Sequence, residues 1–291
     1  MENLTSPREI IALLKRHGFH FTKDLGQNFL IDDDILRQTV DGADIQADDN
    51  VLEIGPGIGT LTRSLGQRAH HVVAVEIDRR LLPILKETLS SQDNVSIIHG
   101  DVLKIDVAEL ILREFDGHPF KIVANLPYYI TTPIVMSFLE SKLPYQSITV
   151  MVQKEVADRM KAAPGTKDYG ALSVAVQYYS QPQILVKAPS SVFMPVPKVD
   201  SVVIKLNRLE HPPIELVDQD LFFTVVRASF SQRRKTILNA ISAYAPLGLH
   251  RGQTEALLKA CSILPIRRGE TLSLEEFGRV SDYLFHNREA L

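Results

Sequence analysis

The stretch KIVANLPYYITTPI, residues 121–134, places an amide, a proline and two tyrosines directly after an apolar run. Asn and Pro are common in turns and Tyr is common at the rim of a protein, so an ordinary loop is one interpretation. The alternative is a pocket for a flat, polar molecule, in which Asn125 accepts a hydrogen bond, Pro127 stiffens the turn and Tyr128 stacks on a ring. We expect Tyr129 to be a packing residue rather than a second stacking platform.

The stretch VLEIGPGIGTLT, residues 51–62, is typical of a strand, a glycine turn and the start of a helix. Gly55, Gly57 and Gly59 stand at alternate positions, where the lack of a Cβ lets the backbone turn sharply and approach a ligand closely. The first such turn of a parallel sheet is where open α/β folds bind nucleotides. Dinucleotide-binding proteins usually carry G-x-G-x-x-G, whereas here the pattern is E-x-G-x-G-x-G from Glu53, which favours a different cofactor.

Two carboxylates follow the next two predicted strands. Glu76 stands 21 residues after Gly55, where an acidic side chain can accept both hydrogens of a ribose diol. Asp101 ends the following strand, where it can accept a hydrogen bond from an adenine amine. Either residue alone could be an ordinary surface carboxylate, but their places at successive strand ends indicate an adenosine site.

The elements that must position these residues alternate between short β-rich runs and helical patterns, which predicts an α/β fold with a parallel sheet covered on both faces. The predicted strands lie at residues 50–55, 71–77, 94–101, 121–127 and 147–155. Residues 182–189, 190–199 and 200–207 are strand-like without intervening helices, and we expect them to form an antiparallel edge on the same sheet. Residues 21–33 are expected to form an ordered loop rather than a strand.

A proline-containing linker near residues 207–217 separates the α/β part from a region with only helical patterns. We therefore predict two domains, residues 1–207 and a smaller all-helical domain at 208–291. Two capping boxes are expected, Ser6 with Glu9 at the first helix and Ser273 with Glu276 at the last.

Composition places the chain among ordinary globular proteins, with 291 residues, 45% hydrophobic and 23% charged, and a net charge of −3. The sequence shows no signal-peptide pattern and no apolar run near the ~20 residues of a membrane helix, so we expect a cytoplasmic protein without membrane contact. The single Cys261 excludes an internal disulfide and forms no metal-ligand cluster, so no metal is expected. Nothing in the sequence demands more than a monomer.

Seven segments, in their order and spacing, resemble the ribosomal-RNA adenine dimethyltransferase family over nearly the whole chain. They are LGQNFLID, VLEIGPGIGTLT, VEID, GDVL, VANLPYYITTPI, VFMPVPKVDS and FSQRRKTILNAI. The resemblance implies a class I S-adenosylmethionine-dependent methyltransferase. Its fold would be a Rossmann-like, mostly parallel seven-stranded sheet with a smaller all-helical C-terminal domain.

The resemblance also implies roles for individual residues around S-adenosylmethionine. Glu53 would help to organise the loop near the methionine end, Glu76 would hold the ribose and Asp101 the adenine. The remaining cofactor-binding positions would be Asn28, Leu30, Gly55, Gly57 and Asn125.

On the substrate side, the delocalised lone pair makes an adenine amine a poor nucleophile. Acceptors at the Asn125 side chain and at a backbone carbonyl near Leu126 or Pro127 would orient the amine toward the methyl group. The target must leave its stack to reach such a pocket. Tyr128 would stack on it, and Phe193 is either a second aromatic clamp or a core residue beside two turn prolines.

The implied substrate is a hairpin loop near the 3′ end of 16S rRNA, in which two adjacent adenosines are dimethylated within a small-subunit assembly intermediate. Arg233, Arg234 and Lys235 form either a solvated helix face or a phosphate-binding patch. The alternatives are a large-subunit rRNA adenine methyltransferase of the antibiotic-resistance type and a non-catalytic ribosome-assembly or transcription factor. An NAD-dependent oxidoreductase is opposed by the glycine spacing and by the lack of an obvious acid/base for hydride transfer.

Overall fold

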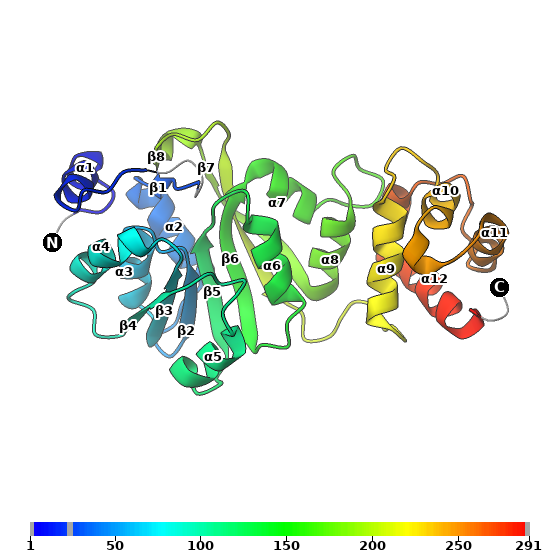
Figure 1. The fold of residues 1–291 in the computed structure, drawn as a ribbon, viewed down its shortest axis with the longest axis horizontal. Coiled ribbons are helices and arrows are strands. Elements are labelled where there is room, and N and C mark those ends of the chain that lie inside the picture. The colour runs from blue at the N-terminus through cyan, green and yellow to red at the C-terminus, as the bar shows by residue number, and fades with distance from the viewer. Residues whose placement is uncertain (1–2, 22–25, 289–291) are drawn as a thin grey trace. The chain divides into compact units, whose positions relative to one another are not determined.

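The structure is a computed structural model and describes residues 3–21 and 26–288. It divides into two compact units (Figure 1), of which the first contains the residues up to Ala157 together with Gln181–Arg208. The second contains Asp158–Ser180 and the residues from Leu209 onward. This division differs from the predicted domains in one segment, because Asp158–Ser180 groups with the C-terminal helices.

The first unit is built on a seven-stranded sheet in the order β4-β3-β2-β5-β6-β9-β7 (Figure 1). The strands are β2 (Asn50–Ile54), β3 (His71–Glu76), β4 (Val95–His99), β5 (Phe120–Asn125), β6 (Tyr145–Gln153), β7 (Ser180–Ala188) and β9 (Ser201–Arg208). The strands from β4 to β6 are parallel, and β9 pairs antiparallel with β6 from Ser147↔Asn207 to Gln153↔Ser201. The predicted mostly parallel seven-stranded sheet is therefore confirmed.

One part of the predicted edge is wrong. Residues 190–199 do not join the main sheet, because β8 (Phe193–Met194) pairs antiparallel with β1 (Phe29–Leu30) in a separate two-stranded sheet. The expected loop at residues 21–33 thus contains a short strand. Leu30 and Phe193 are paired and both lie in one buried cluster, so packing between remote segments forms this strand pair.

Helices cover both faces of the large sheet (Figure 1). The helices that lie or begin in this unit are α1 (Pro7–Arg16), α2 (Asp33–Ala43), α3 (Thr60–Gly66), α4 (Leu82–Thr88), α5 (Val107–Phe115), α6 (Thr131–Leu139) and α7 (Lys154–Met160). Apolar side chains of α2 and α3 and of the strands form one buried cluster, which holds the sheet by removing apolar surface from water. The predicted capping box at Ser6 is wrong: the Ser6 side chain makes no capping bond, and the Glu9 carboxylate accepts from the backbone N–H of Asn3.

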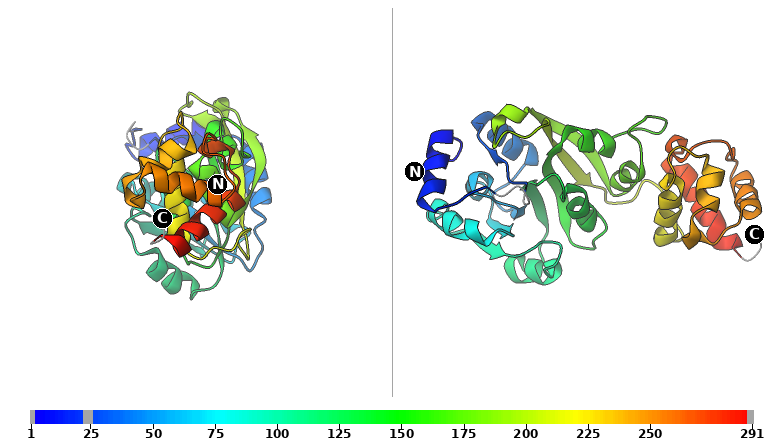
Figure 2. Two further views of the ribbon diagram at one scale, coloured as in Figure 1. Left: turned by 90° about the vertical axis from the view of Figure 1, so that its right-hand side faces the viewer. Right: turned by 45° about the horizontal axis from the view of Figure 1, so that its top comes forward.

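The second unit is helical, apart from its connecting turns. Its helices are α8 (Ala171–Tyr179), α9 (Gln219–Phe230), α10 (Ile237–Ser242), α11 (Arg251–Ala260) and α12 (Leu274–Asn287). Figure 2 shows α9, in yellow, packed beside α12, in red. The Ser273–Glu276 capping box is confirmed, with both reciprocal bonds present.

The segment Asp158–Ser180 packs with this unit through aromatic contacts. The rings of Tyr178 and Phe222 lie 5.5 Å apart between centroids, and those of Tyr169 and Phe230 lie 6.0 Å apart. Sequence periodicity does not reveal these contacts, since they join residues far apart in the chain.

Four short 3₁₀ helices complete the described structure, at Arg79–Leu81, Ser190–Val192, Ala245–Leu247 and Gly269–Thr271. Within residues 3–21 and 26–288, none of the helices has both the length and the apolar character that crossing a membrane requires.

Candidate active site

A pocket opens at the carboxyl edge of the parallel strands, where β2, β3, β4 and β5 all end. It is lined by residues that follow these strands and by the segment around β1. The predicted residues that it brings together are Asn28, Leu30, Gly55, Gly57, Glu76, Asp101, Asn125, Pro127 and Tyr128.

The glycine turn after β2 forms the floor of the pocket. Gly55, Gly57 and Gly59 have φ values of +71°, +61° and +88°, which side chains rarely adopt. A Cβ on Gly57 would also lie 3.1 Å from the Phe29 ring, so this position needs glycine for its conformation and for the approach of β1. The turn therefore brings the backbone close to the space a cofactor would fill, while the N–H groups of its three glycines bond Val75, Glu76 and Pro56.

Glu76 is held at the end of β3 by two backbone N–H groups and is only 4% exposed. Its Oε1 accepts from the N–H of Asp78 at 2.7 Å, and its Oε2 accepts from the N–H of Gly57 at 3.2 Å. Burial raises the pKa of Glu76 to about 7. Each carboxyl oxygen keeps a further lone pair, so the group can still accept from a ribose diol.

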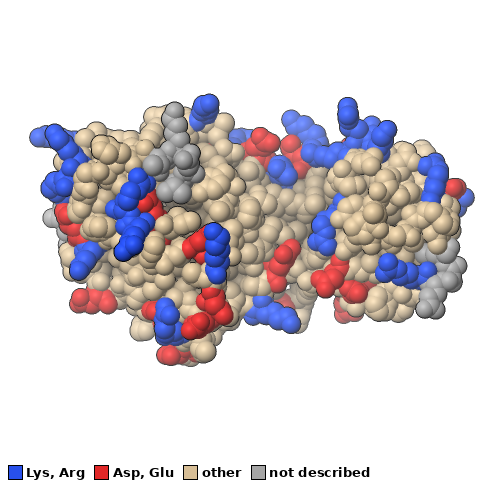
Figure 3. All heavy atoms as spheres, viewed as in Figure 1, with Lys and Arg blue, Asp and Glu red and all other residues tan. Residues whose placement is uncertain are grey.

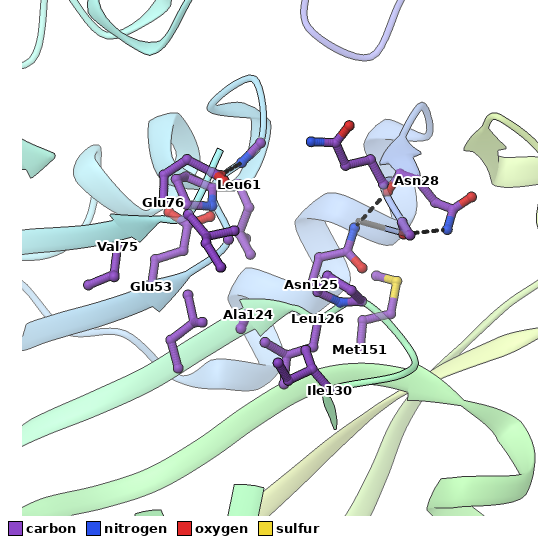
Figure 4. Close-up of a pocket in the computed structure, with 18 of the residues that line it drawn as sticks. Asn28, Glu53, Leu61, Val75, Glu76, Ala124, Asn125, Leu126, Ile130 and Met151 are labelled. Atoms are coloured by element: carbon purple, nitrogen blue, oxygen red, sulfur yellow. Dashed lines mark hydrogen bonds between the residues drawn. The ribbon is translucent and has the colours of Figure 1, made fainter. Parts of the chain in front are cut away.

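Glu53 lies on β2 beside the same pocket (Figure 4) and is 1% exposed. Its Oε2 has no hydrogen-bond partner in the part of the chain that the structure describes. Burial, with a smaller contribution from the charge of Glu76, raises the pKa of Glu53 to about 8, and the Thr62 hydroxyl opposes this rise in part. A buried carboxyl oxygen without a partner is costly, so this position fits a ligand that brings positive charge. S-adenosylmethionine carries such charge at its sulfonium and ammonium groups.

A third carboxylate, Asp78, was not singled out from the sequence. It is buried and accepts from Gln27 Nε2 at 2.8 Å and from Arg80 Nη2 at 2.6 Å. The hydrogen bonds from Arg80 hold the pKa of Asp78 below its usual value. This network ties the segment before β1 to the end of β3, and no spacing in the sequence connects residues 27 and 78.

Asp101 lines the pocket after β4. Its Oδ1 accepts from the backbone N–H of Leu103 at 3.1 Å, and its Oδ2 lies 3.2 Å from Lys104 Nζ. The carboxylate is thus oriented by its own turn and keeps acceptor capacity for an amine.

Asn125 ends β5 and points toward the segment that precedes β1, as Figure 4 shows. Its Nδ2 donates to the carbonyl of Asn28 at 3.3 Å, and Asn28 Nδ2 donates to the carbonyl of Gly26 at 3.0 Å. Because the amide nitrogen is used in this way, the side-chain oxygen of Asn125 is the atom available to an incoming donor. Amide assignment thus follows from the hydrogen-bond network.

The turn after β5 separates the candidate backbone acceptors. The carbonyl of Pro127 accepts from the Ile130 N–H at 3.2 Å and from Thr131 Oγ1 at 3.1 Å. It is therefore occupied, and the Leu126 carbonyl is the better candidate.

Tyr128 lines the pocket with its hydroxyl anchored. Its Oη lies 2.7 Å from Ser201 Oγ, and Ser201 is 1% exposed. Burial raises the pKa of the Tyr128 hydroxyl. The ring is therefore held in a defined position and stays neutral at physiological pH.

Phe193 and Tyr129 lie in different environments. Phe193 is 2% exposed, belongs to the buried cluster and does not line the pocket, so it is a core phenylalanine rather than a second clamp. Phe193 lies on β8, where it is paired with Leu30 of β1. Tyr129 lines the pocket and is 58% exposed, so the described chain leaves more than half of its surface uncovered.

The predicted basic triplet lies in the second unit, in the turn between α9 and α10. Arg233 Nη2 donates to the carbonyls of Lys167 and Tyr169 at 2.9 and 3.1 Å. Arg234 and Lys235 are exposed, and no side-chain partner is seen for them among the described residues. Figure 3 shows Lys and Arg side chains gathered at the upper edge of this unit.

Comparisons with known proteins agree with this site. Residues 18–285 match the family described as "Ribosomal RNA adenine dimethylase". A relative from Alkaliphilus metalliredigens (strain QYMF), named "Ribosomal RNA small subunit methyltransferase A", is 54% identical over 97% of this chain and 98% of its own. A relative of the same name from Geobacillus thermodenitrificans (strain NG80-2) is 53% identical over 97% of each chain.

Among solved structures, a dimethyladenosine transferase from Plasmodium falciparum superposes with a TM-score of 0.71 and 25% identity, over 89% of this chain and 97% of that one. The 23S rRNA methyltransferase ErmE gives a TM-score of 0.65 and 29% identity, over 88% and 99%. Since the match extends over nearly the full length and includes the strands that carry the pocket, the chain belongs to the ribosomal RNA adenine dimethylase family.

Proposed function

We propose that the protein transfers methyl groups from S-adenosylmethionine to the exocyclic amines of two adjacent adenosines in a hairpin loop near the 3′ end of 16S rRNA, during assembly of the small ribosomal subunit. The observation that carries the choice of subunit is the 54% identity, over nearly the whole chain, to a protein named as a small-subunit methyltransferase. The identity to the large-subunit enzyme is 29%.

The cofactor would be held at three points along the carboxyl edge of the sheet. Glu76 would accept from the ribose hydroxyls and Asp101 from the adenine amine, while Glu53 would lie toward the positive charge. The glycine turn, Asn28 and Leu30 would surround the methionine part. The bound cofactor supplies a methyl group on a good sulfonium leaving group, so the protein's main task is alignment.

The target amine would be oriented by two acceptors. In the first transfer, the Asn125 side-chain oxygen and the Leu126 carbonyl would each accept a hydrogen bond from one N–H of the amine, which directs the nitrogen lone pair toward the methyl group. Alignment of this kind can supply about 7–11 kcal/mol of a barrier. Tyr128 would stack on the base and contribute about 1–3 kcal/mol to its binding.

The basic turn would bind the RNA backbone. Arg234 and Lys235 are exposed and suited to phosphate, and Arg233 would support them by anchoring the turn to the Lys167 and Tyr169 carbonyls. Phosphate contacts of this kind make binding depend on salt. In this scheme, residues 1–207 form the methyltransferase domain and residues 208–291 the docking domain, and a monomer suffices because one chain supplies the whole pocket.

The test is transfer of label from S-adenosylmethionine to unmethylated small subunits, large-subunit RNA, DNA or protein. Dimethyladenosine in the small subunit alone is the expected result, and label in large-subunit RNA would instead support the function of the ErmE-like relative. Absence of label from every substrate would support a non-catalytic assembly role.

Asn125→Ala tests the chemistry in the same assay. The substitution should abolish transfer while cofactor binding remains measurable by calorimetry. Asn287→Ala, at the end of α12, removes an amide that donates to the Tyr283 carbonyl in the second unit, and it serves as the control. Turnover near that of the wild type in Asn125→Ala would refute the assigned role.

A further inference from the structure

The two tyrosines after Pro127 have opposite environments although they are neighbours in the chain. Tyr128 is partly buried, and its hydroxyl is bonded to Ser201. Tyr129 is 58% exposed, yet it also lines the pocket. A large ring left in solvent at the mouth of a site has apolar surface that the folded chain does not cover.

The Tyr129 ring nevertheless has a neighbour along one side. The ring lies against Gly26, because a Cβ built on that glycine would be 3.4 Å from Cδ1 and 3.5 Å from Cε1 of Tyr129. The turn that carries Tyr129 is closed by the hydrogen bond from the Ile130 N–H to the Pro127 carbonyl, at 3.2 Å. The ring is therefore supported along one side and open along the rest, so little entropy is lost when a flat ligand covers it.

A base that enters the pocket leaves its neighbour without a stacking partner. Single-stranded RNA loops are commonly bound by aromatic side chains that stack on such unstacked bases. Stacking tolerates any base, because every base has a π-face. An exposed ring beside the base pocket is placed to take up that neighbour.

We propose that Tyr129 is a second nucleobase-binding position, which stacks on the nucleotide adjacent to the target adenosine in the same RNA loop. This inference rests on the proposed function. For a substrate with two adjacent target adenosines, Tyr129 holds one at the mouth while the other is in the pocket.

The test compares Tyr129→Ala, Tyr129→Leu and Tyr129→Phe in the full chain, with S-adenosylmethionine and unmethylated small subunits. Loss of the stacking ring in the Ala and Leu variants should raise KM for the subunit by about 5- to 150-fold. Tyr129→Phe keeps the ring and should stay near the wild type. Cofactor affinity, measured by calorimetry without RNA, should be the same in all four proteins.

Three results would overturn the proposal. Equal KM values in the Ala variant and the wild type would show that the ring binds nothing. A Phe variant as defective as the Ala variant would show that the hydroxyl, rather than stacking, makes the contact. A loss of cofactor affinity that matches the rise in KM would show that the residue acts through Gly26 on the cofactor side.

The wild type separates this proposal from the proposed function. Its transfer to small subunits tests the function, and the KM ratios of the variants test the stacking position on whichever RNA the wild type methylates. If the wild type methylates large-subunit RNA instead, the proposed function fails and the same ratios are measured there. If it methylates no RNA, both fail.

Discussion

The free energy of unfolding of the cofactor-free Glu53→Gln variant, relative to that of the wild type, should increase as pH rises. Burial raises the pKa of Glu53 to about 8, against 4.5 for an ordinary glutamate. The folded state therefore binds this proton more tightly than the unfolded state does. The stability that the proton contributes is fully present below about pH 4.5 and is lost as pH rises through about 8.

The size of the effect follows from the same two values. Between them, the free energy of unfolding falls by at most about 1.4 kcal/mol for each pH unit. From pH 5 to pH 8, the wild type should lose about 3 kcal/mol relative to Glu53→Gln. The constant cost of burying the Gln amide shifts this difference equally at every pH, so only its pH dependence is diagnostic.

Differential scanning calorimetry from pH 5 to pH 8 is the assay, because it can separate the transitions of the two units. The pH-dependent difference in unfolding free energy between the wild type and Glu53→Gln should be seen in the transition of the first unit, which contains Glu53. Gln146→Ala, which removes an exposed, uncharged side chain on β6, is the control and should differ from the wild type by the same amount at every pH. Saturating S-adenosylmethionine should reduce the pH dependence of the stability difference between the wild type and Glu53→Gln, because positive charge in the pocket favours the ionised Glu53 carboxylate. A difference that does not change with pH would refute the reasoning.

Three further outcomes are expected. Tyr128→Phe and Ser201→Ala each remove one partner of the 2.7 Å hydrogen bond, so each should lower kcat/KM by about 5-fold. The double variant should lose no more activity than either single variant. Additive losses would instead show that the two hydroxyls have independent roles. Gln27→Leu removes the hydrogen bond from Gln27 to the buried Asp78 carboxylate. Cofactor affinity, measured by calorimetry, should fall about 5- to 10-fold, while the melting temperature of the helical unit should not change. Replacing Arg234 and Lys235 together by Ala should reduce the slope of log affinity against log salt by about 1.5, and an unchanged slope would return this turn to a solvated surface.

The part of the site carried by strand ends was predictable from the sequence. Parallel strands end at one edge of a sheet, so Glu76, Asp101 and Asn125 were expected to meet once the alternating pattern was recognised. The glycines of the turn after β2 were also predictable, because a sharp turn requires positive φ values that glycine adopts readily.

The features that the sequence did not predict depend on contacts between distant segments. Whether Phe193 or Tyr129 is buried depends on which chain segment covers it, and neither hydrophobicity nor spacing encodes that. The two-residue pairing of β1 with β8 is too short to leave a periodic signal. At α1, Glu9 bonds Asn3 instead of completing the box with Ser6, a choice made by the chain before the helix.

The pairing of β1 with β8 and of β6 with β9 has a consequence for the order in which the molecule folds. Every described residue that lines the pocket lies between Gly26 and Met151, whereas the segments that brace β1, β6 and Tyr128 lie between Phe193 and Arg208. Closing such long loops costs conformational entropy before the contacts form, so remote pairings are slow. A nascent chain that ends before residue 193 would carry all of the pocket's side chains but none of these braces. Cofactor binding should therefore be acquired late in folding, only after the chain has been synthesised as far as Arg208.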